Sequence, residues 1–472
     1  MSHGGVCRPC ISSIDKSKPE STWRDFSLRL DTIHPCHLIK ASAVHGRRTM
    51  RRRALQLVST RIGRSQRPLA CGAQLGTLTA ARSRMSTVAA APTAPLSTLS
   101  AETFHPPAPT PAPTPAAAPE TDGEQQRRAK QILRRAVAAT APRHDWTREE
   151  IAAIYHQPLL ELAYQAAAVH RRFHDPAEVQ LCTLMNIKTG GCTEDCSYCA
   201  QSTRYQKGTG LQAKRVESVE TVLEAARIAK ENGSTRFCMG AAWRDMRGRK
   251  TSLRNIKEMV QGVRAMGMEV CVTLGMIDAE QARELKEAGL TAYNHNLDTS
   301  REFYPSIITT RTYDERLETL GHVRDAGIHV CSGGILGLGE SDADRVGLLH
   351  SVATLPSHPE SFPVNALVPI KGTPLGERER VEFTSVLRTV AAARIVMPET
   401  IIRIAAGRKT MPEEQQALCF MAGANAVFTG DKMLTTECNG WDEDADMFGR
   451  WGLRPMRSFR KTAVAPGEDS PN

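Results

Sequence analysis

A unit of about 30 residues recurs along this chain from Val179 onward, and it limits the possible folds more than any other feature. Each unit holds an amphipathic stretch with helical spacing, a glycine where that stretch ends, and a short run rich in β-branched residues. Glycine favours the left-handed conformation that closes a helix. The predicted helix ends lie at Gly233, Gly267, Gly289, Gly327 and Gly423. Helices that alternate with strands in this way indicate parallel βαβ units.

Eight segments of this repeat have the composition of strands. They cover residues 180–187, 235–239, 269–274, 291–296, 328–333, 363–368, 401–406 and 425–429. Eight strand–helix units spread over roughly 250 residues predict a closed (β/α)8 barrel of the TIM type. An open, doubly wound parallel sheet is the alternative, because the sequence does not show whether the last strand pairs with the first.

We expect the barrel to occupy residues 143–456 and to begin with a helical lead-in. Residues 145–150 (DWTREE) combine an N-cap signal with acids in a first helical turn, and residues 151–172 have apolar positions at helical spacing. One or two helices are therefore predicted ahead of the first strand. The polar tail at 457–472 is expected to be disordered.

Three cysteines form a C-x3-C-x2-C run directly behind the glycine pair Gly190-Gly191: Cys192, Cys196 and Cys199. Soft thiolate ligands select zinc, copper(I) or an iron–sulfur cluster. Three thiolates on a four-iron cluster leave one iron free to bind a substrate or cofactor. A structural zinc site with a remote fourth ligand is the alternative.

Polar residues interrupt the predicted barrel strands, which normally consist of Val, Ile and Leu. Cys238, Cys271 and Cys331 lie on three of these strands and Arg403 on a fourth. A single buried cysteine is usually a small apolar residue, and we read Cys182 in this way, with a role in sulfur chemistry left open. Residues of a closed barrel alternate between inside and outside, so the three thiols are expected to converge.

A buried guanidinium is costly without partners. Arg403 therefore either forms an ion pair with a carboxylate inside the barrel or offsets the negative charge of a thiolate cluster. The second interpretation predicts a cage of three thiolates and Arg403 around a second, smaller iron–sulfur cluster.

The basic character of the chain is confined to its N-terminal part, so it does not indicate a nucleic-acid-binding face. Residues 1–120 contain 16 Lys and Arg against 6 Asp and Glu, whereas the remainder contains 45 of each. Thirteen scattered cysteines do not resemble a disulfide framework, and a reducing compartment is favoured. No run of about 18 apolar residues occurs, so no transmembrane helix and no membrane partner are expected.

We predict that residues 1–125 form a disordered extension. No Asp or Glu lies between Thr32 and Ala101, while Arg recurs among Ala, Ser and Leu, as in organellar transit peptides. A transit-like segment at about 50–101 predicts a mitochondrial (matrix) protein, and residues 106–119 read as an extended Pro/Ala-rich linker. The alternative is a disordered RNA-binding tail.

Several long sequence segments in the predicted folded part resemble those of the biotin synthase family, a branch of the radical S-adenosylmethionine superfamily. They run from about Trp146 to Leu453 and include KTGGCTEDCSYCAQS, YNHNLDTS, FYPSIITTRTYDER, CSGGILGLGE and CFMAGANAVFTGDKMLTT. The resemblance implies a (β/α)8 sulfurtransferase that inserts sulfur into dethiobiotin by way of a 5′-deoxyadenosyl radical. It also implies that Cys192, Cys196 and Cys199 hold a [4Fe–4S] cluster to which S-adenosylmethionine binds.

The same resemblance implies that Cys238, Cys271, Cys331 and Arg403 hold a [2Fe–2S] cluster that donates the sulfur. Asn296, Asp298 and Arg316 would contact S-adenosylmethionine, and Asn296 and Asn365 would contact dethiobiotin. It further implies an electron-donor protein of the ferredoxin or flavodoxin type, iron–sulfur assembly proteins and a homodimer. Two alternatives remain: a radical enzyme of the same fold without sulfur donation, and a basic, metal-binding, RNA-associated protein.

Overall fold

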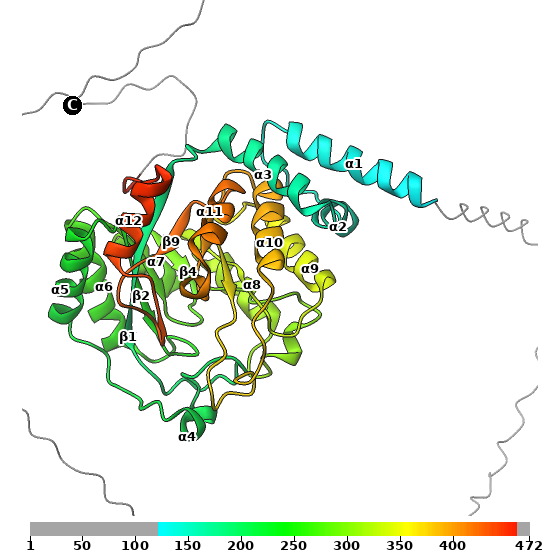
Figure 1. Cartoon of the computed structure of the whole chain (residues 1–472). Helices are drawn as coiled ribbons and strands as arrows, with labels where there is room; N and C mark the ends of the chain where they lie inside the picture. The colour runs from blue at the N-terminus through cyan, green and yellow to red at the C-terminus, as the bar shows by residue number, and fades with distance from the viewer. Residues whose placement is uncertain (1–120, 460–472) are drawn as a thin grey trace, which may run out of the picture. The chain divides into compact units, whose positions relative to one another are not determined.

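A computed structural model of the chain describes residues 121–459. The predicted transit-like segment, the Pro/Ala-rich linker and most of the predicted tail lie outside the described residues. Within them, strands and helices alternate along the chain (Figure 1), as the repeat in the sequence predicts.

The strands form one parallel barrel. Its members are β1 (Glu178–Lys188), β2 (Arg236–Ala241), β3 (Glu269–Thr273), β4 (Ala292–Asn294), β5 (His329–Cys331), β6 (Gly334–Leu336), β7 (Ser361–Ala366), β8 (Ile401–Ile404) and β9 (Ala426–Phe428). Neighbours along the chain pair in parallel, and β1 pairs with β9, for example Leu181 with Val427. The closed (β/α)8 barrel is thereby confirmed, and the open sheet is wrong.

The strands β5 and β6 share one position in the barrel, because both pair with β7. The break falls at Ser332-Gly333. A Cβ atom on Gly333 would lie 2.1 Å from the carbonyl oxygen of Pro363, and one on Gly334 would lie 2.2 Å from Leu348 Cδ2. Only glycine lets the chain pass this close to its neighbours.

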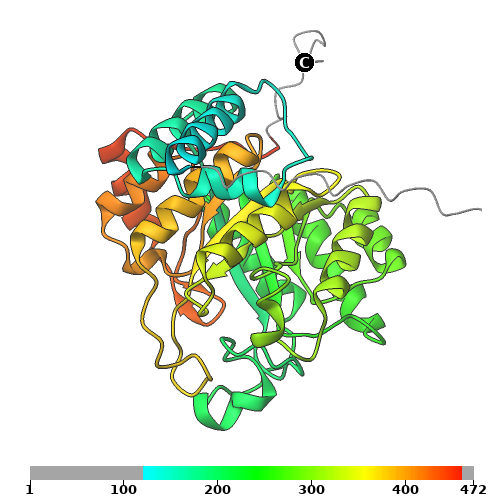
Figure 2. The same cartoon turned by 90° about the vertical axis from the view of Figure 1, so that its right-hand side faces the viewer.

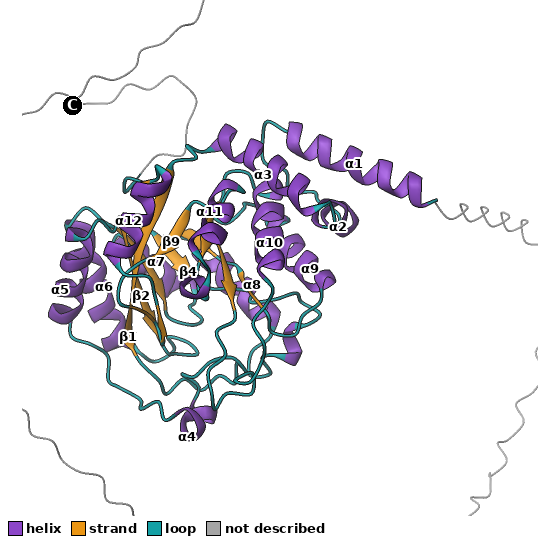
Figure 3. Ribbon diagram, viewed as in Figure 1, coloured by secondary structure: helices purple, strands orange, loops and turns teal. Residues whose placement is uncertain are grey.

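One helix follows each strand position and packs outside the barrel (Figure 3). These helices are α5 (Val219–Glu231), α6 (Lys250–Ala265), α7 (Ala279–Glu287), α8 (Tyr313–Asp325), α9 (Asp342–Ala353), α10 (Phe383–Val396), α11 (Glu413–Met421) and α12 (Trp441–Trp451). Hydroxyl or carboxylate N-caps start several of them, such as Ser218, Asp278 and Thr312. The five glycines predicted to end helices all have positive φ.

Three helices precede the barrel: α1 (Asp122–Ala138), α2 (Arg148–Tyr155) and α3 (Leu159–Phe173). Thr147 and Glu150 form the capping box of α2, at the predicted N-cap signal. The helix α1 lies ahead of residue 143, where order was expected to begin. Only Ile132, Leu133 and Ala136 of this helix are buried, so its apolar pattern is weak in the sequence.

These leading helices pack on the outer helices rather than on the strands: α3 contacts α10, and α2 contacts α9. They lie at one end of the barrel, and the short helix α4 (Gln206–Thr209) lies at the other (Figure 2). Because α4 follows the end of β1, the second end carries the loops that leave the C-terminal ends of the strands. In (β/α)8 enzymes this end carries the active site. A hairpin of β10 (Lys432–Met433) and β11 (Thr436–Glu437) also belongs to these loops.

Strand side chains divide between two apolar environments with a period of two. On β3, Val270 and Val272 join the main core between the strands and the helices, whereas Cys271 belongs to a separate cluster inside the barrel. None of the helices within 121–459 has the length and apolar character that a membrane crossing requires.

Candidate active site

A cavity of about 310 Å³ lies inside the barrel. Its walls come from the loops after the strands and from the β10–β11 hairpin, and its inner end comes from the strands themselves. Nine of the residues predicted from the sequence line it: Cys199, Cys238, Cys271, Asn296, Asp298, Arg316, Cys331, Asn365 and Arg403. Cys192 and Cys196 lie on the same loop as Cys199.

The loop with the three-cysteine motif is fixed by its own backbone. The N–H of Cys192 donates to the carbonyl of Gln201 (3.1 Å), and the N–H of Cys199 donates to the carbonyl of Cys196 (2.9 Å). Gly190 and Gly191 both have positive φ and turn the chain sharply after β1. The motif thus forms a compact turn at the mouth of the cavity.

Burial controls the protonation of this triad. It raises the pKa of Cys199 to about 11 and also raises the pKa values of Cys192 and Cys196. The protein's own charges therefore do not create thiolates here, and a bound metal centre would have to deprotonate these thiols. Such behaviour fits metal ligands rather than free nucleophiles.

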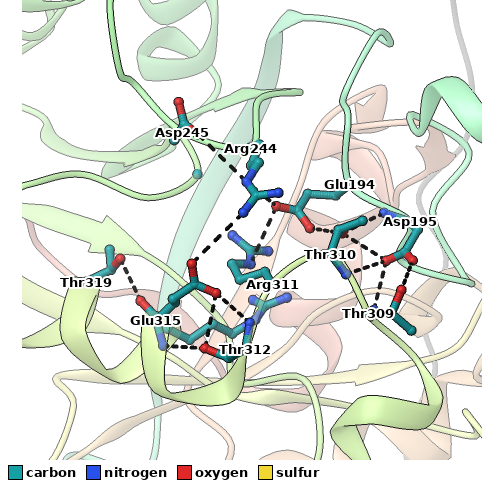
Figure 4. Close-up of polar contacts among 12 residues, drawn as sticks. Glu194, Asp195, Arg244, Asp245, Thr309, Thr310, Arg311, Thr312, Glu315 and Thr319 are labelled. Atoms are coloured by element: carbon teal, nitrogen blue, oxygen red, sulfur yellow. Dashed lines mark hydrogen bonds and ion pairs between the residues drawn. The ribbon is translucent and has the colours of Figure 1, made fainter.

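The two acids between the cysteines bind the loop that precedes α8 (Figure 4). Asp195 Oδ1 accepts the N–H groups of Thr309 (3.0 Å) and Thr310 (3.2 Å), and the hydroxyls of both threonines also donate to this carboxylate. Although burial opposes ionisation, these hydrogen bonds lower the pKa of Asp195 to about 2. The three-cysteine loop is thereby clamped to residues 309–310.

The neighbouring carboxylate, Glu194, faces two arginines (Figure 4). Its Oε1 lies 3.5 Å from Arg244 Nε and 3.9 Å from Arg311 Nε. Arg311 is buried and lines the cavity. Glu194, Asp195 and Arg311 were not predicted from the sequence, although the paired acids inside the cysteine motif and the first arginine of TTRTYDER were visible there.

In the loop after β4, Asp298 accepts hydrogen bonds from two side chains. The hydroxyl of Tyr198 donates to its Oδ2 (2.8 Å), and Arg316 Nη2 does the same (2.6 Å). Arg316 also donates through Nε to the hydroxyl of Tyr304 (2.7 Å). Asp298 has φ of 68°, a left-handed conformation that is uncommon outside glycine and occurs most readily for Asp and Asn. Arg316, predicted to contact S-adenosylmethionine, thus pairs with a carboxylate of the protein.

The two predicted asparagines organise the backbone at the cavity wall. Asn296 Oδ1 accepts the N–H of Gly333 (3.2 Å). Asn365 donates to the carbonyl of Gly334 (2.9 Å) and accepts the N–H of Ala406 (3.2 Å). An amide has four hydrogen-bonding positions, so each side chain keeps capacity for a ligand.

The thiols on the strands lie together, as predicted. Cys238 and Cys271 are register partners on β2 and β3, and Asn294 Nδ2 of β4 donates to the sulfur of its partner Cys331 (3.2 Å). All three cysteines belong to one buried cluster inside the barrel. The contact with Cys271 lowers the pKa of Cys331 to about 6, and the positive charge of Arg403 contributes.

Arg403 lies at the inner end of the cavity and is 1% exposed. Nη2 donates to Gln180 Oε1 (2.8 Å), and Nη1 donates to the carbonyl of Val427 (3.3 Å). Among residues 121–459 it forms no ion pair, and its Nε is buried without a hydrogen-bond partner. The predicted alternative of a carboxylate partner is therefore wrong, and the guanidinium keeps a donor for a group inside the cavity.

The inner end holds further polar residues that were not predicted from the sequence. Gln180 links Arg403 to Glu269, because its Nε2 donates to Glu269 Oε2 (3.1 Å). Glu269 also pairs with Arg236 (2.6 Å), which lines the cavity beside the thiols. Gln180 and Cys182 share the inward face of β1 at i and i+2, a periodicity that was present in the sequence.

The cysteines and the arginine of this site suit iron–sulfur clusters as ligands. No three His, Cys, Asp or Glu side chains of the described part converge as ligands of a single metal ion, which gives no support to the zinc alternative. Cluster thiolates bind different irons and therefore do not need one common point. Two groups of thiols, one of them beside a guanidinium with an unpartnered Nε, match the soft, anionic character of such clusters.

Two family models match this part of the chain. The Radical SAM superfamily model matches residues 186–352, and the Biotin and Thiamin Synthesis associated domain model matches residues 363–454. The first includes the three-cysteine loop and the strands that carry Cys238, Cys271 and Cys331, which are called the inner thiols below. The second includes Arg403.

Curated relatives match at high identity. "Biotin synthase, mitochondrial" of Emericella nidulans is 75% identical over 333 residues, which cover 71% of this chain and 84% of the relative. "Biotin synthase" of Schizosaccharomyces pombe is 60% identical over 345 residues, which cover 73% of this chain and 94% of the relative.

Among solved structures, the FeFe-hydrogenase maturase of Carboxydothermus hydrogenoformans superposes with a TM-score of 0.60 at 16% identity, over 71% of this chain and 79% of that one. At this identity the likeness shows the fold alone. The identities to the curated relatives, together with both family models, show that the chain belongs to the biotin synthase family of radical S-adenosylmethionine enzymes, which are sulfurtransferases.

Proposed function

We propose that this chain converts dethiobiotin into biotin with two iron–sulfur clusters held at opposite ends of one cavity. Cys192, Cys196 and Cys199 would hold a [4Fe–4S] cluster. Cys238, Cys271, Cys331 and Arg403 would hold a [2Fe–2S] cluster that donates sulfur. The catalytic unit would span residues 143–456.

One observation carries this proposal: Cys199, the inner thiols and Arg403 line the same cavity. When bound, the four-iron cluster with S-adenosylmethionine supplies a 5′-deoxyadenosyl radical, and the two-iron cluster supplies sulfur. The chain's part is to align these groups with the substrate and to exclude water. Leu184, Ile335 and Phe428 supply apolar surface to this cavity, and Leu184 and Phe428 pack against the inner thiols.

We assign Asn296 and Asp298 to S-adenosylmethionine, because both lie in the loop after β4 and line the cavity. Both donors to Asp298 reach Oδ2, and Oδ1 would accept from the ribose hydroxyls. Arg316 would face the methionyl carboxylate, and the buried Arg311 offers a second cation in the same wall. Asn296 and Asn365 would use their remaining amide positions for the ureido ring of dethiobiotin.

The proposed compartment and partner proteins follow from the names of the relatives and from the proposed reaction. The relative from Emericella nidulans is named mitochondrial, and we propose the mitochondrial matrix for this chain. Each radical needs one electron, so the partner would be a ferredoxin- or flavodoxin-type protein. Consumption of sulfide requires iron–sulfur assembly proteins, and a homodimer is proposed from the family resemblance. No nucleic acid is proposed as a partner, because the charge excess lies outside the barrel.

Anaerobic reconstitution of the full chain with iron-57 and sulfide, followed by Mössbauer spectroscopy, tests the two-cluster assignment. We expect a four-iron and a two-iron component. Cys331→Ala should abolish biotin formation and remove the two-iron component but retain reductive cleavage of S-adenosylmethionine. The matched control is Cys419→Ala, which removes an equally buried cysteine outside both groups of thiols. A wild-type protein with the four-iron component alone would refute the assignment.

A further inference from the structure

The inner group holds four thiols rather than the three that the proposed cluster uses. Cys182, on β1, is fully buried and belongs to the same cluster as Cys238, Cys271 and Cys331. The four buried thiols on β1, β2, β3 and β5 therefore form one cluster inside the barrel.

Cys182 and Arg403 converge on one atom. The thiol of Cys182 donates to Gln180 Oε1 (3.6 Å), and Arg403 Nη2 donates to the same oxygen (2.8 Å). The strand β9 lies between β8, which carries Arg403, and β1, which carries Cys182. The side chains of Arg403 and Cys182 therefore meet across one strand, at Gln180.

We propose that Cys182 is a reserve ligand of the inner site and takes the ligand position of Arg403 when the guanidine withdraws or is removed. This inference rests on the proposed two-cluster function. It assigns the inner site two alternative sets of four ligands: three thiolates with Arg403, or four thiolates.

The exchange is balanced without an oxidant or reductant. With the cluster bound, the bond between iron and a neutral Arg403 nitrogen would break as a bond between iron and Cys182 sulfur forms. The proton of the Cys182 thiol would move to the guanidine, which would leave as a guanidinium held by Gln180 and Val427. The product has one more thiolate ligand, and additional negative charge lowers the reduction potential of an iron–sulfur cluster.

The experiment compares full-length wild type, Cys182→Ser, Arg403→Ala and the double variant after reconstitution with iron-57 and sulfide. The two-iron Mössbauer component and its reduction potential are measured in each, and circular dichroism checks that each variant is folded. Arg403→Ala combined with Cys419→Ser serves as the matched control, because Cys419 is equally buried but lies outside the inner group.

We expect Arg403→Ala to keep the two-iron component at a more negative potential, because four thiolates now hold it. Adding Cys182→Ser should lower the two-iron content roughly tenfold or more, whereas adding Cys419→Ser should not. Cys182→Ser alone should match wild type. A folded double variant that keeps the two-iron component at the level of Arg403→Ala would overturn the role of Cys182 alone. Absence of this component from wild type would overturn the proposed function and this inference with it.

Discussion

The clamp on the three-cysteine loop yields the sharpest quantitative prediction. Asp195 is 8% exposed and accepts four hydrogen bonds from Thr309 and Thr310. In Asp195→Asn, an amide nitrogen replaces one of the two carboxylate oxygens. This nitrogen then faces hydrogen-bond donors of Thr309 and Thr310, and the negative charge is lost. Removing a buried charged partner costs about 1.5–3 kcal/mol, so we expect the clamp to weaken by about 2 kcal/mol.

If this free energy holds the thiols in ligand geometry, the four-iron cluster should lose iron to a chelator roughly 30-fold faster, since 1.36 kcal/mol corresponds to a factor of ten. The assay follows the coloured ferrous chelate after anaerobic mixing, with the two-iron component monitored separately. Asp314→Asn is the matched control, because its ion pair with Arg301 is exposed. Equal rates of iron loss in Asp195→Asn and wild type would refute the role of the clamp.

Three further perturbations test the scaffold. His170 is 1% exposed, and burial lowers its pKa to about 2. The unfolded state therefore binds a proton near pH 6.5 that the folded state excludes. As a result, the free energy of unfolding of the apoprotein should fall by about 2 kcal/mol from pH 7 to pH 5. Denaturant titrations should show this fall diminished in His170→Gln, and an unchanged fall would contradict the assignment. Asp444→Asn breaks a buried ion pair with Arg408 (2.7 Å) and should lower the free energy of unfolding by about 3–5 kcal/mol; a loss below 1 kcal/mol would show that the pair is dispensable. Gly333→Ala places a methyl group against the carbonyl oxygen of Pro363 and should abolish soluble barrel, as judged by size-exclusion chromatography; a monodisperse, fully folded variant would refute the close contact.

Much of the site was visible in the sequence because it depends on local rules. The three-cysteine motif is contiguous, and the inner thiols stand on short strands whose period of two fixes which side chains point inward. Once eight strands are placed in order, Cys238 and Cys271 must lie near each other, and the structure pairs them.

Several contacts that tune the site were not visible, because they join residues more than 100 positions apart. Asp195 meets Thr309 and Thr310 across 114 and 115 positions, and Gln180 meets Arg403 across 223. Arg316 shows a different limit. Its motif predicted a cation that binds a ligand. Although Asp298 lies nearby in the sequence, the motif did not reveal that Asp298 pairs with Arg316.

By itself the sequence determined the order of strands and helices, the three-cysteine loop and the set of inward thiols, because periodicity and motif spacing are properties of neighbouring residues. The tertiary structure alone decided that β1 pairs with β9, that Arg403 has no carboxylate partner within 121–459, and that Cys182 shares Gln180 with Arg403. Closure of the barrel brings the first strand beside the last, and only this closure places Cys182 and Arg403 at the same inner site.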